Sequence, residues 1–150
     1  MGGEKVHIRK FIRKTIVECL NENSGLKFYE YEELERTIRE LGLGESNYKK
    51  LKEDFINASP VKLKLSIWQQ LENTDYDVNS PDDVKERLIQ YDRSPENYDK
   101  ILDEIKKGKW YPPLILKINN AYYLVAGNTR LMVAKVNNII PIVKIIEFKK

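Results

Sequence analysis

The feature that most constrains the fold is a pair of short apolar segments in the C-terminal third of the chain. Between Leu114–Ile118 and Tyr122–Val125 lie Asn119-Asn120, which suit a turn, and Ala121. Asparagine tolerates the left-handed backbone of a tight turn, and the flanking segments are strand-like in length and composition. The pattern therefore predicts a β-hairpin, which restricts the fold to one that contains an antiparallel pair of strands.

The hairpin is followed by a glycine, a short helical segment and one more apolar segment. Gly127 interrupts the second strand, Thr129–Val136 is predicted to be a short helix, and Ile142–Ile146 a final buried strand. When a strand turns directly into a helix, the first N–H groups of the helix have no partner within it. With the partial positive charge of the helix dipole, such amides form a site for an anion.

The turn itself contains residues suited to phosphate. Gly127 lets the backbone approach a ligand closely, and Arg130 can donate two parallel hydrogen bonds to a phosphate. Asn128 and Thr129 add an amide and a hydroxyl at the same rim. A capped helix with an exposed arginine would have the same local sequence, so the surroundings of the turn decide between the two interpretations.

Before residue 58 the chain has the periodicity of amphipathic helices. His7–Leu20, Tyr31–Leu41 and Asn47–Asn57 each repeat apolar residues three and four positions apart. We therefore expect residues 1–58 to form a three-helix N-terminal extension and residues 59–150 to form the main domain.

The main domain is predicted to begin with a strand and two helices. Val61–Ile67 alternates apolar and polar residues, as a half-buried strand does. Ser80-Pro81 and Ser94-Pro95 each place a hydroxyl at an N-cap and proline at the first helical position. The predicted fold class is thus α+β, with a small mixed sheet and packed helices.

The composition limits the class of protein. The apolar runs are too short to span a membrane, and we see no secretory signal, so we expect no membrane association and a cytoplasmic location. The single cysteine, Cys19, excludes an internal disulfide and a multi-cysteine metal site. With His7 as the one histidine, we expect no protein-held metal centre.

The order of elements from residue 101 onward resembles the core of the ParB/sulfiredoxin-like superfamily. The matching features are a helix ending at Gly108, a strand led by Pro112-Pro113, the hairpin, the turn Gly127–Arg130, and a last strand led by Pro141. The resemblance implies nucleotide binding, with the phosphates held by Gly127, Asn128, Thr129 and Arg130 and a nucleoside triphosphate with Mg²⁺ as cofactor. A small, phage-type member in a bacterial, archaeal or phage-infected cell would fit.

The chain also departs from the family pattern. Sulfiredoxins have a reactive cysteine in this turn, whereas Cys19 is far from it in the sequence. Many small relatives have an acid before the glycine and a histidine before the arginine, where this chain has Ala126 and Thr129. We therefore expect neither sulfiredoxin chemistry nor an acid–base pair in the turn. A DNA-reading region after Lys150 would be needed for a complete partition protein, which we do not expect.

Other residues are weaker candidates. Arg93 precedes the second predicted helix and could reach a phosphate, although a surface arginine is the simpler interpretation. Lys109 and Trp110 could bring a cation and a ring near a base, although Trp110 also suits a core position. Glu104 is the weak catalytic candidate. The remaining carboxylates, Asp75, Asp77, Asp99 and Asp103, have no diagnostic spacing and are expected on the solvated surface.

Three functions remain open at this point. The first is a nucleotide- or phosphate-binding domain, acting either as a sensor or as an enzyme that hydrolyses or transfers phosphate groups. The second is a non-catalytic interaction module, whose N-terminal helices hold a protein partner or a second copy of the chain. The third is a DNA-associated nuclease, suggested by the naming of the family and by the basic residues of the first predicted helix, whereas the net charge of +3 argues against strong DNA binding.

Overall fold

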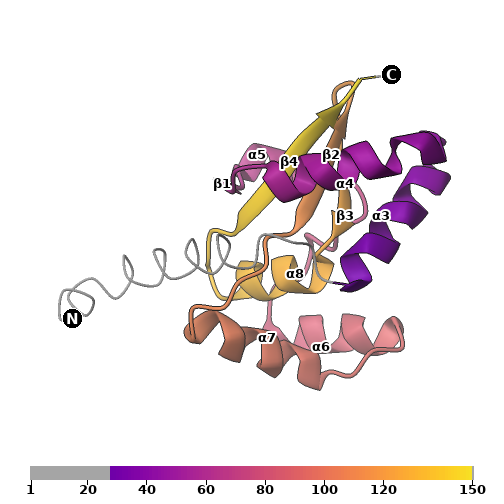
Figure 1. The fold of residues 1–150 in the computed structure, drawn as a ribbon. Coiled ribbons are helices and arrows are strands. Elements are labelled where there is room, and N and C mark those ends of the chain that lie inside the picture. Colours follow the sequence, from indigo (N-terminus) through magenta and orange to yellow (C-terminus); the bar gives the residue numbers. More distant parts are fainter. Residues whose placement is uncertain (1–27, 150) are drawn as a thin grey trace.

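The computed structural model describes residues 28–149 (Figure 1). This part of the chain contains six α-helices and a four-stranded mixed sheet, which confirms the α+β class. The predicted helix His7–Leu20 lies outside the described residues.

The sheet has the strand order β1-β4-β2-β3. The hairpin is confirmed, because β2 and β3 are antiparallel and Asn119 in the connecting turn has a φ of 57°. β4 joins β2 in parallel after the chain has crossed over through α8. The strands are β1 (Val61–Lys62), β2 (Leu114–Ile118), β3 (Ala121–Ala126) and β4 (Ile142–Phe148).

The predicted strand over Val61–Ile67 is wrong in most of its length. Only β1 forms, and the chain then enters helix α5, Leu65–Gln70. The N–H groups of Ile67 and Trp68 both donate to the carbonyl of Lys64, which starts the helix. Trp68 is buried in the core, whereas Leu65 is 57% exposed. The helix places this large ring in the core, and the alternating pattern did not include it.

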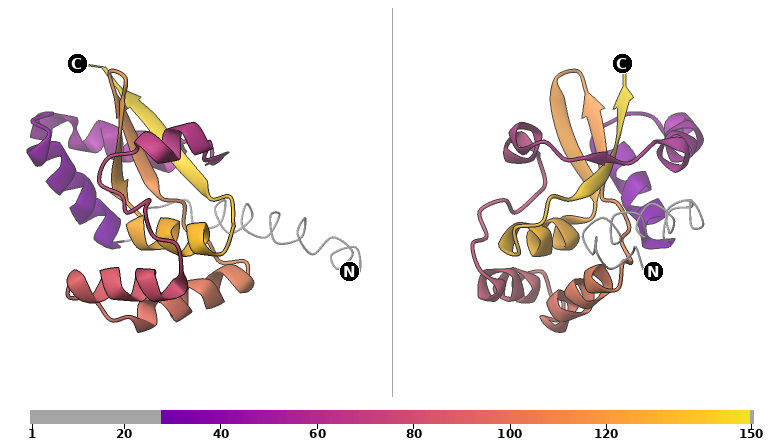
Figure 2. Two further views of the ribbon diagram at one scale, coloured as in Figure 1. Left: turned by 180° about the vertical axis from the view of Figure 1, so that it is seen from behind. Right: turned by 90° about the vertical axis from the view of Figure 1, so that its left-hand side faces the viewer.

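Two N-terminal helices cover one face of the sheet (Figures 1 and 2). These are α3 (Phe28–Glu40) and α4 (Tyr48–Asn57), with the short 3-10 helix η1 (Glu45–Asn47) between them. Leu34 and Phe55 share one apolar cluster with strand residues such as Leu116. Residues 28–58 of the expected extension therefore form a layer of the same core as the sheet.

A buried lysine fastens this layer. Lys144 of β4 is 5% exposed and donates hydrogen bonds to the carbonyls of Phe55 (2.9 Å) and Ile56 (3.1 Å). These carbonyls belong to the last turn of α4, where a cation is favoured. Burial lowers the pKa of the Lys144 ammonium.

The remaining helices share a second apolar cluster with Ile115, Leu124 and Val143 of the sheet, and within it α6 and α7 pack on α8 and on each other, below the sheet (Figure 2). The predicted cap of α6 is confirmed, because the Oγ of Ser80 accepts from the N–H of Asp83 at 3.2 Å. α7 begins one residue later than predicted, with Pro95 as its cap residue. The helices of this group are α5, α6 (Pro81–Gln90), α7 (Glu96–Lys106) and α8 (Asn128–Val136).

Candidate functional site

The site is built around the glycine that joins β3 to α8. Gly127 has a φ of 108°, which side chains on L-residues rarely allow. A Cβ atom at this position would lie 2.6 Å from the Cβ of Pro113. Glycine is therefore required twice, by its backbone angle and by its contact with the proline, and the strand can pass directly into the helix.

The first two amides of α8 have no hydrogen-bond acceptor in the described part of the chain. The carbonyl of Gly127 accepts from the N–H of Leu131, which is the first helical hydrogen bond. Within residues 28–149, no carbonyl or side chain accepts from the N–H groups of Asn128 or Thr129. Both residues line a cleft of about 900 Å³.

The walls of this cleft come from helices that are distant in the sequence. On each wall the lining residues are spaced three and four positions apart, so each group occupies one face of its helix. The wall from α3 consists of Glu33, Arg36, Thr37 and Glu40, and the wall from α7 consists of Asn97, Lys100, Ile101 and Glu104.

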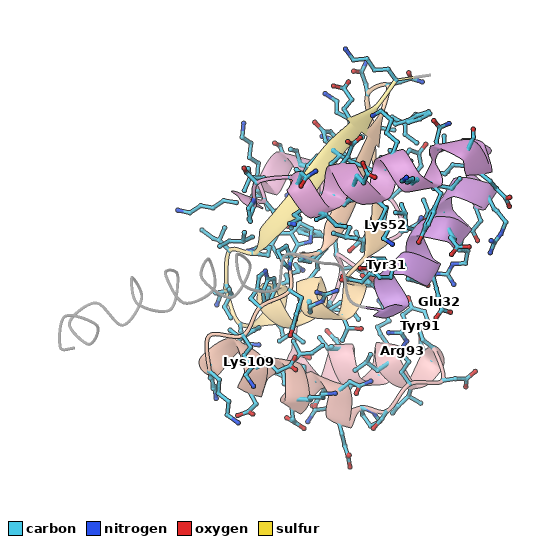
Figure 3. All side chains as sticks on the ribbon, viewed as in Figure 1. Tyr31, Glu32, Lys52, Tyr91, Arg93 and Lys109 are labelled. Atoms are coloured by element: carbon cyan, nitrogen blue, oxygen red, sulfur yellow. The ribbon has the colours of Figure 1, made fainter. Side chains whose placement is uncertain are left out.

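Two of the cations that line the cleft are available to a ligand. Arg93, in the α6–α7 connection, and Lys100, on α7, are exposed and form no ion pair within the described chain. Arg36 differs from them, because its guanidinium is paired with Glu33. Figure 3 shows Arg93 beside Tyr91, between the end of α6 and the start of α3.

Arg130 does not have the expected role of an outward phosphate donor. Its side chain is 6% exposed, and its guanidinium donates to Glu30 of α3 at 2.8 Å and to the carbonyl of Tyr111. Glu30 is itself 3% exposed. Arg130 still lines the cleft, where its buried pair with Glu30 connects α8 to α3. Burial of the guanidinium requires such a partner.

The side chain of Asn128 is also engaged within the protein. Its Oδ1 accepts from the hydroxyl of Thr74 and the N–H of Asp75, each at 3.1 Å, and its Nδ2 donates to the Asp75 carboxylate at 2.8 Å. The chain reaches this position because Glu72 bridges to the edge of β3 through two 2.9 Å backbone hydrogen bonds. Asn128 therefore fastens the 72–75 segment to the start of α8.

Asp75 is not the solvated surface residue that its sequence context predicts. Its side chain is 16% exposed, and it accepts from Arg87 at 2.7 Å and from the Tyr91 hydroxyl at 2.6 Å. The hydrogen bond to Asp75 raises the pKa of Tyr91. Arg87 also binds Asp77 and lowers the pKa of that carboxyl.

The other predicted residues lie in different places. Glu104 lines the cleft and is half-buried. Lys109 lies at the opposite end of α7 from Tyr91 and Arg93, away from the cleft (Figure 3). Trp110 is 5% exposed and donates from Nε1 to the carbonyl of Ile142 at 2.8 Å, so its ring is a core group.

Sequence reasoning missed three residues of this site: Asp75, Tyr91 and Lys100. The spacing of Lys100 from Glu104 could have identified it, since the two occupy one face of α7. Nothing in the local sequence of Asp75 indicates its partners, which are 12 to 53 positions away.

No protein-family model, curated protein or solved structure matches the chain. Within residues 28–149, no three His, Cys, Asp or Glu side chains gather in a group that could hold a metal ion. The same residues include no helix with the length and apolar character needed to cross a membrane.

Proposed function

We propose that the protein binds a phosphorylated ligand, with a nucleotide as the expected class, in the cleft at the start of α8. The observation that carries this proposal is the combination of two unengaged helix amides with two unpaired cations. The amides belong to Asn128 and Thr129, and the cations are Arg93 and Lys100. A helix N-terminus favours an anion through both its N–H groups and its dipole.

In this arrangement each group has a distinct part. The backbone N–H groups of Asn128 and Thr129 hold phosphate oxygens, and the Thr129 hydroxyl lies at the same helix start. Arg93 and Lys100 neutralise the charge from the rim of the cleft. The guanidinium of Arg130 takes no part, because Glu30 and Tyr111 engage it.

The carboxylates of the cleft fit a metal-bridged phosphate only in part. Asp75 accepts hydrogen bonds on both carboxylate oxygens, whereas Glu104 is half-buried and forms no ion pair within residues 28–149. Mg²⁺ commonly keeps several waters and binds one or two carboxylates together with substrate phosphates. Glu104 would be the protein ligand, and the ion would supply neutralisation of the phosphate charge.

The test is calorimetric titration of the full chain with ATP, CTP, GTP and ADP, each with and without Mg²⁺. We expect Arg93→Ala and Lys100→Ala each to weaken binding by about tenfold, since a hydrogen bond to a charged group contributes about 1.5–3 kcal/mol. Lys107→Ala is the matched control, because that lysine is exposed and, among the described residues, its ion pair is with Asp103 at the end of α7. If no nucleotide binds, or if the control weakens binding equally, the proposal is wrong.

A second candidate function, protein interaction, is favoured by three exposed apolar side chains on neighbouring segments: β1, the first residue of α5 and the connection that precedes β4. They belong to Val61, Leu65 and Ile140, which are 45%, 57% and 64% exposed. Clusters of exposed apolar side chains mark interaction sites more often than isolated ones do. Under this function the double variant Leu65→Glu/Ile140→Glu should abolish a stable complex in a pull-down and leave nucleotide titrations unchanged.

A further inference from the structure

The aromatic ring of Tyr91 has an unusual combination of fixed position and exposure. The residue is 48% exposed and lines the cleft, yet its hydroxyl is held by Asp75 at 2.6 Å. No aromatic ring or cation of residues 28–149 stacks on it. Because its hydroxyl is hydrogen-bonded and no described ring or cation stacks on it, the aromatic ring of Tyr91 is available to stack with a planar ligand.

From this geometry we infer that Tyr91 is the stacking surface for an aromatic base, so the ligand of the cleft is a nucleotide and not a sugar phosphate or inorganic phosphate. The inference rests on the proposed function, because it needs a phosphate at the start of α8. Stacking on an aromatic side chain accepts any nucleobase, since each base has a π-face. Tyr91 therefore selects for the presence of a base and not for its identity.

The carboxylate of Asp75 fixes the position of the Tyr91 ring relative to the N-terminus of α8, where the phosphate is proposed to bind. Asp75 accepts from the hydroxyl of Tyr91 and also from the Nδ2 of Asn128, the first residue of α8. Arg87 holds the same carboxylate at 2.7 Å. The ring and the helix start are thus connected through a single group before any ligand arrives, which lowers the ordering cost of binding.

Arg93 supports the same arrangement from the other side. It follows Tyr91 by two residues in the α6–α7 connection, and both side chains lie in the same region between α6 and α3 (Figure 3). A base on the ring of Tyr91 would leave its phosphates within the part of the cleft that contains Arg93 and the start of α8. A ligand without a base would use the cations and amides alone.

The experiment compares ATP with inorganic tripolyphosphate, which has the same phosphates and no base, on the full chain. Ribose 5-phosphate serves as the sugar phosphate. The variants are Tyr91→Leu, which removes the ring, and Tyr91→Phe, which keeps the ring and removes the anchor. We expect Tyr91→Leu to weaken ATP about tenfold or more and to leave tripolyphosphate within about twofold. Tyr91→Phe should lie between the wild type and Tyr91→Leu.

Each outcome has a defined meaning. If tripolyphosphate and ATP bind equally well and Tyr91→Leu changes neither, the stacking inference is overturned while the proposed phosphate site stands. If tripolyphosphate and ATP both fail to bind to the wild type, the proposed function and this inference fall together. If Tyr91→Leu weakens both ligands equally while Tyr91→Phe weakens neither, the residue has a structural part only, and the inference is again overturned. Thermal unfolding of each variant checks that the fold is retained.

Discussion

The two ends of the turn from Gly127 to Arg130 differ in what their polar groups contact. At the inner end, the guanidinium of Arg130 is buried in a pair with Glu30. At the outer end, the N–H groups of Asn128 and Thr129 lie at the cleft with no acceptor in the described chain. The residue type most strongly associated with phosphate is thus the structural one. The difference teaches that the ligand-facing charge at a helix start can come from other elements, here Arg93 and Lys100.

The largest loss of stability should come from removing the ion pair between Arg130 and Glu30 at the inner end of the turn. Arg130→Met removes the guanidinium that pairs with the buried carboxylate of Glu30, which should lower the free energy of unfolding by about 3–5 kcal/mol. Urea unfolding measures this directly. Adding Glu30→Gln to Arg130→Met should restore part of the loss. Lys107→Met is the matched control, because its pair with Asp103 is mostly exposed and should contribute less than about 1 kcal/mol. Equal losses in the two single variants would show that Arg130 is not structural.

Gly127→Ala should produce the next largest loss. Alanine would have to adopt the left-handed backbone of this position, and its Cβ would overlap Pro113, so we expect a loss of about 2–4 kcal/mol. Gly42→Ala separates the two causes, because Gly42 has a φ of 64° with no atom within 4 Å of the added Cβ. That control should lose about 1 kcal/mol from backbone strain alone. A similar loss at both positions in urea unfolding would remove Pro113 from the explanation.

Asn128 combines the properties of both ends of the turn. Its side chain forms hydrogen bonds within the protein, whereas its N–H has no acceptor in the described chain. Asn128→Ala removes three hydrogen bonds to Thr74 and Asp75 and should cost about 1–3 kcal/mol. Hydrogen exchange at the amide of Asp75 should become faster, because that N–H donates to the missing Oδ1. If exchange there is unchanged, the segment from Glu72 to Asp75 is held by β3 and not by Asn128.

The sequence allowed the local parts of this arrangement to be predicted, and tertiary contacts determined the rest. The hairpin around Asn119 and the cap at Ser80 depend on neighbouring residues, and both are confirmed. The pair between Glu30 and Arg130 spans 100 positions, and no local pattern marks it. The position of the turn was therefore predictable from the sequence, whereas the direction of Arg130 depended on a partner in a distant helix. ParB-like membership and nucleotide binding stay predictions.

The hydrogen bond from the Tyr91 hydroxyl to Asp75 should make a smaller, pH-dependent contribution to the free energy of unfolding. This hydrogen bond raises the pKa of Tyr91, so the folded state keeps this proton at a pH where the unfolded state, with a pKa of about 10, has lost it. The stabilisation is complete below pH ~10 and is lost as the pH rises through the folded pKa. Because the residue is half exposed, Tyr91→Phe should cost less than about 1 kcal/mol at pH 7. The difference should shrink in urea unfolding at alkaline pH, and a constant difference would contradict this origin.

Substitution of Thr129 should have the smallest effect on stability. Its effect on ligand affinity therefore tests most directly whether the outer end of the turn binds phosphate. Its hydroxyl has no partner within residues 28–149, so Thr129→Ala should change the free energy of unfolding by less than about 0.5 kcal/mol. The same change should weaken tripolyphosphate severalfold, because it removes a donor beside the helix amides. Thr129→Ser, which keeps the hydroxyl, should bind as the wild type does. The opposite result would be a Thr129→Ala variant that is destabilised as strongly as Arg130→Met but binds tripolyphosphate as the wild type does. The hydroxyl would then stabilise the fold and would not bind the ligand, and the two ends of the turn would not differ.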